Sequence, residues 1–145
     1  MSQTTRVFLC GIVTGAVAFL LAVLVLGLVG GEFVAAVEAA RRPTPLPGWS
    51  GWVLHLAAGV WTLWLYTAIR PSYGPGTKTA AVAGFASWVI GVLAAATWGS
   101  LGVIPLNVLL LVAAVGLPAW IVGAVLGAWP YEASERRPSQ ALKAT

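Results

Sequence analysis

Long apolar stretches separated by short polar segments dominate the pattern of this chain. Four of them are long enough to cross a bilayer: residues 7–29, 48–69, 79–98 and 106–129. None of the four contains Lys, Arg, Asp or Glu, and the second contains the only histidine of the chain, His55. An α-helix needs about 20 apolar residues to span the hydrocarbon core. The pattern therefore predicts an all-α fold of four transmembrane helices.

The connecting segments predict a bundle of up-down-up-down topology in one domain, 1–145. The connection 30–47 is the longest, and its last part, PTPLPG, cannot sustain a helix because its prolines lack amide hydrogens. The segment PSYGPGT, residues 71–77, is expected to be a tight turn, since Gly and Pro supply the backbone angles that turns need. Residues 130–145 form a polar tail, which is expected to be disordered from Glu132 onward.

The composition and charge exclude a water-soluble globular protein. Charged residues make up 8% of the chain, whereas soluble domains carry about 25%. The net charge of +4 does not indicate nucleic-acid binding, because the basic residues stand singly or in pairs at the ends of the apolar stretches. One cysteine permits no internal disulfide.

Basic residues also predict the orientation, since Lys and Arg collect in cytoplasmic loops. Only Arg41 and Arg42 fall on the side of the first and third connections. The opposite side carries Arg6, Arg70, Lys78, Arg136, Arg137 and Lys143. We therefore expect both termini in the cytoplasm and a location in a bacterial inner membrane. Arg70 and Lys78 bracket the second connection and are expected to meet lipid phosphates.

Small residues recur at helical spacing within each apolar stretch. In lipid, helices associate where small side chains let their backbones approach closely. We expect inward-facing packing stripes, with the alternative that these faces contact a partner protein. The stripes include Gly11, Gly15, Gly59, Gly84, Gly91, Gly123 and Gly127.

The histidine lies on a helical face with small and polar residues, which predicts that it points into the bundle. We expect a neutral imidazole unless an acid lies near, and ionisable groups inside a membrane are candidates for function. The polar residues expected at its level are Glu32 and Asn107. The alternative is structural, a neutral His55 that hydrogen-bonds a neighbouring helix. A metal site would need further ligands, and none is indicated.

Eight tryptophans are many for 145 residues. Most fall where interfacial aromatic belts are expected, but Trp61, Trp88 and Trp120 fall near the bilayer middle. These three either pack plainly, hydrogen-bond across helices, or line a cavity for a lipid, quinone or pigment. Pro118 should kink the fourth helix and release the carbonyl of Ala114, and Trp120 is the indole expected to reach it.

The segments LYTAIRPSYGPGTKTAAVAG and LGAWPYE resemble small bacterial four-helix membrane proteins of uncharacterised function. The resemblance covers most of residues 50–132 and implies the four-helix topology, with no catalytic residues. The chain departs from that pattern at Pro130, which leaves the end of the fourth helix open.

The near-absence of polar chemistry within the spans favours a non-catalytic protein. The first hypothesis is a structural or accessory subunit that packs against itself as a homo-oligomer or joins a larger membrane complex. The second is a binding or transport protein for a small apolar or pigment-like ligand, which would use His55 and the central tryptophans. An enzyme is not expected, since no acid–base pair can be built within the bilayer, and no cofactor is indicated.

Overall fold

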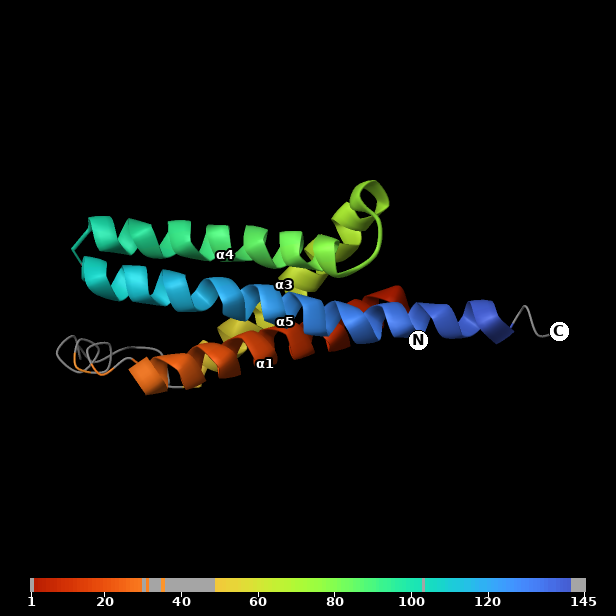
Figure 1. The fold of residues 1–145 in the computed structure, drawn as a ribbon, viewed down its shortest axis with the longest axis horizontal. Helices are drawn as coiled ribbons and strands as arrows, with labels where there is room; N and C mark the ends of the chain where they lie inside the picture. Colours follow the sequence, from red (N-terminus) through yellow and green to blue (C-terminus); the bar gives the residue numbers. More distant parts are fainter. Residues whose placement is uncertain (1, 30, 32–34, 36–48, 103, 142–145) are drawn as a thin grey trace.

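The computed structural model describes residues 2–29, 31, 35, 49–102 and 104–141, which form four long helices (Figure 1). They are α1 (Gln3–Val29), α3 (Ser50–Tyr73), α4 (Thr77–Ser100) and α5 (Leu106–Ala141). The described part of the chain contains no strand. The predicted all-α, four-helix fold is therefore confirmed.

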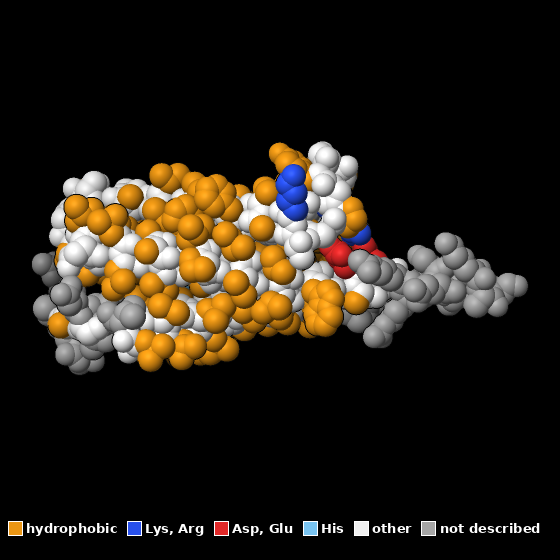
Figure 2. All heavy atoms as spheres, in the orientation of Figure 1, with side chains coloured by type: hydrophobic (Ala, Val, Ile, Leu, Met, Phe, Trp, Pro, Cys, Tyr) orange, Lys and Arg blue, Asp and Glu red, His pale blue; other side chains and the backbone are white. Residues whose placement is uncertain are grey.

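Each helix has the length and composition of a membrane span. The apolar windows cover Gln3–Leu28, Ser50–Tyr73, Thr77–Ser100 and Leu106–Glu135. Large apolar side chains such as Leu28 and Leu93 are exposed along the bundle, and Figure 2 shows apolar side chains over most of the visible face. In water such an exposed apolar surface would promote aggregation, whereas in lipid it is the expected exterior of the protein. The chain is an integral membrane protein.

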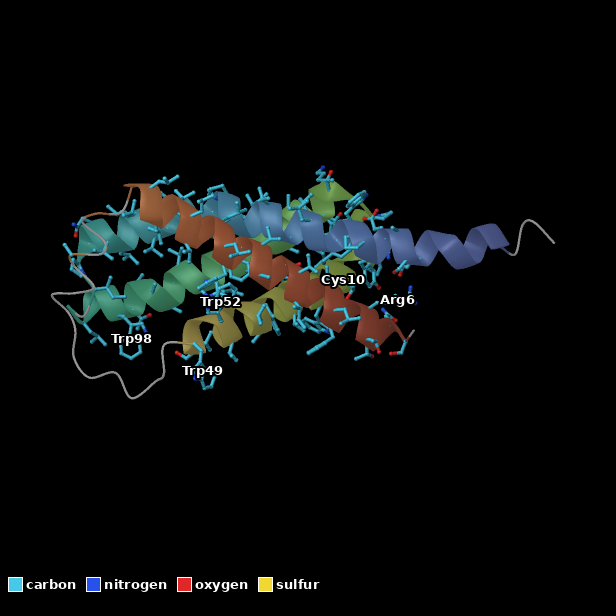
Figure 3. All side chains as sticks on the ribbon, turned by 90° about the horizontal axis from the view of Figure 1, so that it is seen from below. Arg6, Cys10, Trp49, Trp52 and Trp98 are labelled. Carbon is cyan, nitrogen blue, oxygen red and sulfur yellow. The ribbon has the colours of Figure 1, made fainter. Side chains whose placement is uncertain are left out.

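The bundle has two chemically different ends. Figure 3 shows Trp49 and Trp98 at one end and Arg6 toward the other. We call these the Trp98 end and the Arg70 end, because Arg70 lies in the last turn of α3. Trp49 and Trp98 are both exposed, which fits the interfacial position expected for them.

The turn at the Arg70 end is shorter than the sequence predicted. Helix α3 continues through Pro71 to Tyr73 and α4 begins at Thr77, so the prediction of a turn over 71–77 is wrong for its first three residues and for its last. The chain reverses over 74–76, where Gly74 and Gly76 have φ of +80° and +125°. These angles favour glycine. The hydroxyl of Thr79 donates to the Gly74 carbonyl at 2.7 Å and holds the turn against α4.

The tail is the second correction. Helix α5 runs through Pro130 to Ala141, so the prediction of a disordered segment from Glu132 onward is wrong for 132–141, and 142–145 lie outside the described residues. A proline inside a helix removes one backbone hydrogen bond. Contacts of Tyr131, Glu132 and Glu135 with α3, described below, offset this loss.

Helix α1 packs between α3 and α5, and α5 also packs along α4. The closest approach joins α1 to α3, where a Cβ on Gly59 would collide with the backbone of Gly11 and Gly15. Likewise, a Cβ on Gly123 would lie 2.7 Å from the Thr14 carbonyl oxygen. These glycines let the helices approach to backbone contact, as predicted.

Three further glycines complete the comparison with the predicted stripes. Gly127 of α5 lies against Thr14 and Cys10 of α1. A Cβ added to Gly84 of α4 would lie 2.6 Å from the carbonyl oxygen of Trp120 in α5. Gly91 differs, because a Cβ there would meet nothing within 4 Å. Gly91 therefore does not pack closely against the other described helices, and it borders a cavity.

Candidate functional site: the His55 cavity

A cavity of about 300 Å³ lies in the Trp98 half of the bundle, and all four helices contribute to its wall. Most of the lining is Ala, Gly, Val and Leu. Its larger ring-bearing side chains are His55 of α3, Trp88 of α4 and Trp120 of α5. The volume lies at the lower end of the range for small-molecule sites. Small residues here leave space rather than bringing backbones together.

His55 is held by its own helix and by two aromatic rings. Its Nδ1 lies 2.9 Å from the carbonyl oxygen of Gly51. A carbonyl only accepts, so Nδ1 carries the hydrogen, and in the neutral ring Nε2 is then an acceptor. The ring meets Phe19 edge-on at 4.8 Å between centroids and lies nearly parallel to Trp120 at 6.1 Å. This arrangement fixes the plane of the imidazole.

The two cavity tryptophans differ in their hydrogen bonding. Nε1 of Trp88 donates to the carbonyl oxygen of Ala113 in α5 at 2.9 Å. No described residue accepts a hydrogen bond from Nε1 of Trp120. The predicted bond from Trp120 to the Ala114 carbonyl, released by Pro118, is therefore not formed among the described residues. The carbonyl that receives an indole is the preceding one, and the donor comes from another helix.

A hydroxyl bridge joins α3 and α4 on the Arg70 side of the cavity. Oγ1 of Thr62 lies 2.8 Å from Oγ of Ser87 and 2.8 Å from the Ala58 carbonyl oxygen. A hydroxyl has one hydrogen, so when Thr62 donates to Ala58, Ser87 donates to Thr62. Thr62 is buried. The bridge joins the two helices about two turns from His55, toward the Arg70 end.

The structure brings together three of the six predicted ligand-site residues. His55, Trp88 and Trp120 line the cavity. Trp61 does not, because its side chain is 49% exposed on the outer surface of α3 and contacts Trp64. Asn107 is exposed at the start of α5 and does not line the cavity, and Glu32 lies outside the described residues. The rotation of α3 about its axis directs His55 toward the cavity and Trp61 away from it.

Within the described ranges, no three His, Cys, Asp or Glu side chains are grouped closely enough to hold a metal ion. The cavity wall therefore offers hydrogen bonds and aromatic surface rather than a ligand set for a metal.

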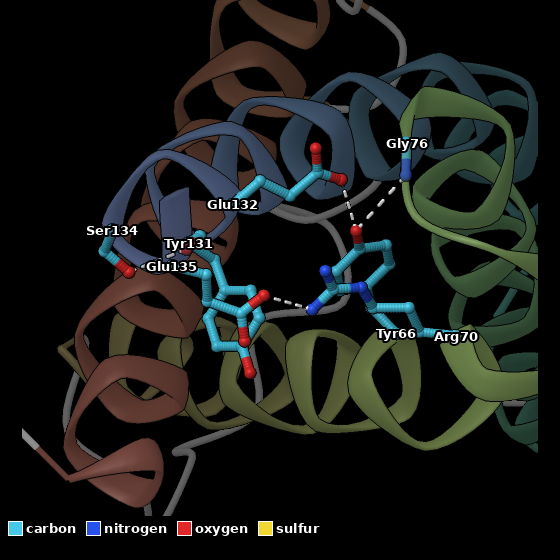
Figure 4. A network of polar contacts seen from close by, with 7 residues as sticks. All are labelled: Tyr66, Arg70, Gly76, Tyr131, Glu132, Ser134 and Glu135. Carbon is cyan, nitrogen blue, oxygen red and sulfur yellow. Dashed lines mark hydrogen bonds and ion pairs between the residues drawn. The ribbon is translucent and has the colours of Figure 1, made fainter. Parts of the chain in front are cut away.

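A second polar cluster lies at the Arg70 end and was not predicted from the sequence (Figure 4). Nη1 of Arg70 pairs with Glu135 of α5 at 2.5 Å, and the hydroxyl of Tyr66 donates to Glu132. Tyr66 and Tyr131 are fully buried and meet edge to face. Arg70 therefore pairs with a carboxylate of its own chain, while its contact with lipid phosphates stays a prediction.

A signal for this cluster is present in the sequence. The chain contains four carboxylates, and two of them, Glu132 and Glu135, stand three residues apart. That spacing places both on one face of a helix, but the expectation of a disordered tail concealed it.

No protein-family model, curated protein or solved structure matches the chain. The chemistry of the site therefore follows from its own side chains.

Proposed function

We propose that this membrane protein binds a small, largely apolar molecule in the His55 cavity. The observation that carries the proposal is the pairing of His55 with the parallel ring of Trp120 in a wall that is otherwise apolar. Small-molecule sites characteristically combine an apolar lining with a few placed polar groups. An unfilled space would also lose the dispersion contacts of the atoms around it, which favours an occupant.

Small side chains in the cavity wall leave the cavity open. Ala58 of α3 and Gly91 and Ala95 of α4 line the cavity. Larger apolar side chains at these positions would fill it, so the cavity exists because these residues are small. Trp88 is anchored by its hydrogen bond to Ala113, so its ring forms a fixed part of the wall. A pre-formed site of this kind lowers the ordering cost of binding.

The accessory-subunit hypothesis stays a prediction. The small-residue stripes that favoured a partner protein are largely used within this chain, since Gly11, Gly15, Gly59 and Gly84 approach the backbone of neighbouring helices. The stripes therefore no longer favour a partner over an internal packing role.

Native mass spectrometry of the protein extracted gently from its membrane tests the proposal. We expect an additional mass on the full chain, and we expect Ala58→Phe, which fills the cavity, to remove it. Ala57→Phe is the matched control, because Ala57 is exposed and does not line the cavity. A chain without added mass, or an added mass that both variants retain, would refute binding in this cavity.

A further inference from the structure

The cavity opens sideways between α3 and α4. Among the lining residues of α5, Val112 is 38% exposed. Helices α3 and α4 contribute two lining residues that are at the surface: Leu54 of α3 is 62% exposed, and Gly91 of α4 is exposed with free space where a Cβ would stand. Both belong to membrane spans. The opening therefore faces the hydrocarbon core of the bilayer rather than water.

The contacts between α3 and α4 explain this opening. Although these helices are consecutive, their interface is smaller than those of α1 with α3 and α5. Its hydrogen bonds lie toward the Arg70 end, where Thr62 meets Ser87 and the Gly76 amide donates to the Tyr66 hydroxyl at 3.4 Å. Above the Thr62–Ser87 bridge, the small residues of α4 leave the two helices apart.

The free hydrogen-bonding atoms of the wall indicate one functional group. With its hydrogen on Nδ1, His55 offers Nε2 as an acceptor. Trp120 offers Nε1 as a donor that no described residue uses, while the Trp88 indole already donates to Ala113. A carbonyl or ether oxygen can only accept, but a hydroxyl donates and accepts at once. A hydroxyl therefore has the hydrogen-bonding capacity that matches both the imidazole acceptor and the indole donor.

We infer that the ligand is a lipid-like alcohol, an apolar chain or ring system with one hydroxyl, which enters from the bilayer between α3 and α4. This inference rests on the proposed function. The hydroxyl donates to Nε2 of His55 and accepts from Nε1 of Trp120, and the apolar part lies along Gly91 and Ala95. A cavity of about 300 Å³ encloses the hydroxyl end, and the rest of a longer chain extends through the opening into lipid.

The single histidine of the chain makes the hydrogen bond directly measurable. The full chain with ¹⁵N-labelled histidine, reconstituted in lipid nanodiscs, is titrated with decanol, methyl decyl ether and decane. Decanol is expected to shift the Nε2 resonance saturably and to bind about tenfold more tightly than the ether, as one added hydrogen bond would produce. Ala58→Phe gives the background from partition into lipid.

The outcomes separate this inference from the proposed function. Saturable, Ala58→Phe-sensitive binding of all three probes without an Nε2 shift would keep the cavity as a binding site and overturn the alcohol. Absence of saturable binding by any probe would overturn both. In His55→Phe, which keeps an aromatic ring, decanol should lose its advantage over the ether.

The lateral route has its own test. Gly91→Leu places a side chain where the opening meets the cavity, and it is expected to slow decanol association at least tenfold, beyond the loss of affinity that filling the cavity causes. Gly27→Leu is the matched control, because Gly27 of α1 is exposed, has free space at its Cβ position and does not line the cavity. Equal association rates in the two variants would overturn access between α3 and α4.

Discussion

The indole nitrogen of Trp88 in α4 donates a hydrogen bond to the carbonyl oxygen of Ala113 in α5, at a distance of 2.9 Å. This bond joins two helices at the cavity wall, in the part of α5 that precedes Pro118. The added Cβ of Gly116 would lie 3.4 Å from the Trp88 ring, so the small residue lets the indole approach α5. The bond both orients the ring and connects the wall across the bundle.

Trp88→Phe should therefore destabilise the protein. Loss of one hydrogen bond costs about 1 kcal/mol, and the smaller ring adds a packing loss. The free energy of unfolding is measured by denaturation in mixed detergent micelles. Trp64→Phe is the control, because Trp64 is half exposed on the surface of α3. Equal losses in the two variants would contradict a specific role for the Trp88–Ala113 bond.

Gly59→Ala should disrupt the contact of α3 with α1. Its new Cβ would collide with the backbone of Gly11 and Gly15, and backbone cannot move aside as a flexible side chain can. We expect a loss of about 1–3 kcal/mol in unfolding free energy, the usual range for overpacking. Gly91→Ala, with no atom within 4 Å of its Cβ, should be neutral or gain up to about 1 kcal/mol from helix propensity. The same loss at both glycines would argue against the α1–α3 contact.

The ion pair between Arg70 and Glu135 should show measurable coupling. The two side chains are 27% and 31% exposed, so solvent screens the pair only in part. A double-mutant cycle with Arg70→Met and Glu135→Gln is expected to give a coupling energy of about 1 kcal/mol. Pairing Lys78→Met with Glu135→Gln supplies the control, since Lys78 is exposed and has no ion pair among the described residues. Additive effects in the Arg70 cycle would show that the pair contributes nothing.

The orientation predicted from the basic residues can be tested with single cysteines. In a Cys10→Ser background, Ser72→Cys reports on the Arg70 end and Ser100→Cys on the Trp98 end, and both serines are exposed. Because positive residues favour the cytoplasmic side, a membrane-impermeant maleimide should label only position 100 in intact bacterial cells. Position 72 should react after permeabilisation. The reverse labelling pattern would place the termini outside the cytoplasm.

The sequence by itself determined the four helices and their membrane character. In lipid, each backbone amide and carbonyl must be paired within its own segment, so a long uncharged stretch has little alternative to a helix. This requirement is local, and it explains why the positions of all four spans were predicted. The same local reasoning failed at Pro71 and Pro130, because proline weakens a helix and cannot show what contacts compensate for it.

Only the tertiary structure decided which faces meet and which space stays open. Gly59 and Gly91 both stand among apolar residues in the sequence. Gly59 nevertheless touches the backbone of α1, whereas Gly91 borders the cavity. Trp61 and Trp88 were equivalent candidates, but helix rotation turned the first to lipid and the second to the cavity wall. The carboxylates of Glu132 and Glu135 reach Tyr66 and Arg70 only because α5 extends beside the end of α3. Such outcomes depend on the rotation and crossing of helices distant in sequence, which the periodicity of one segment does not contain.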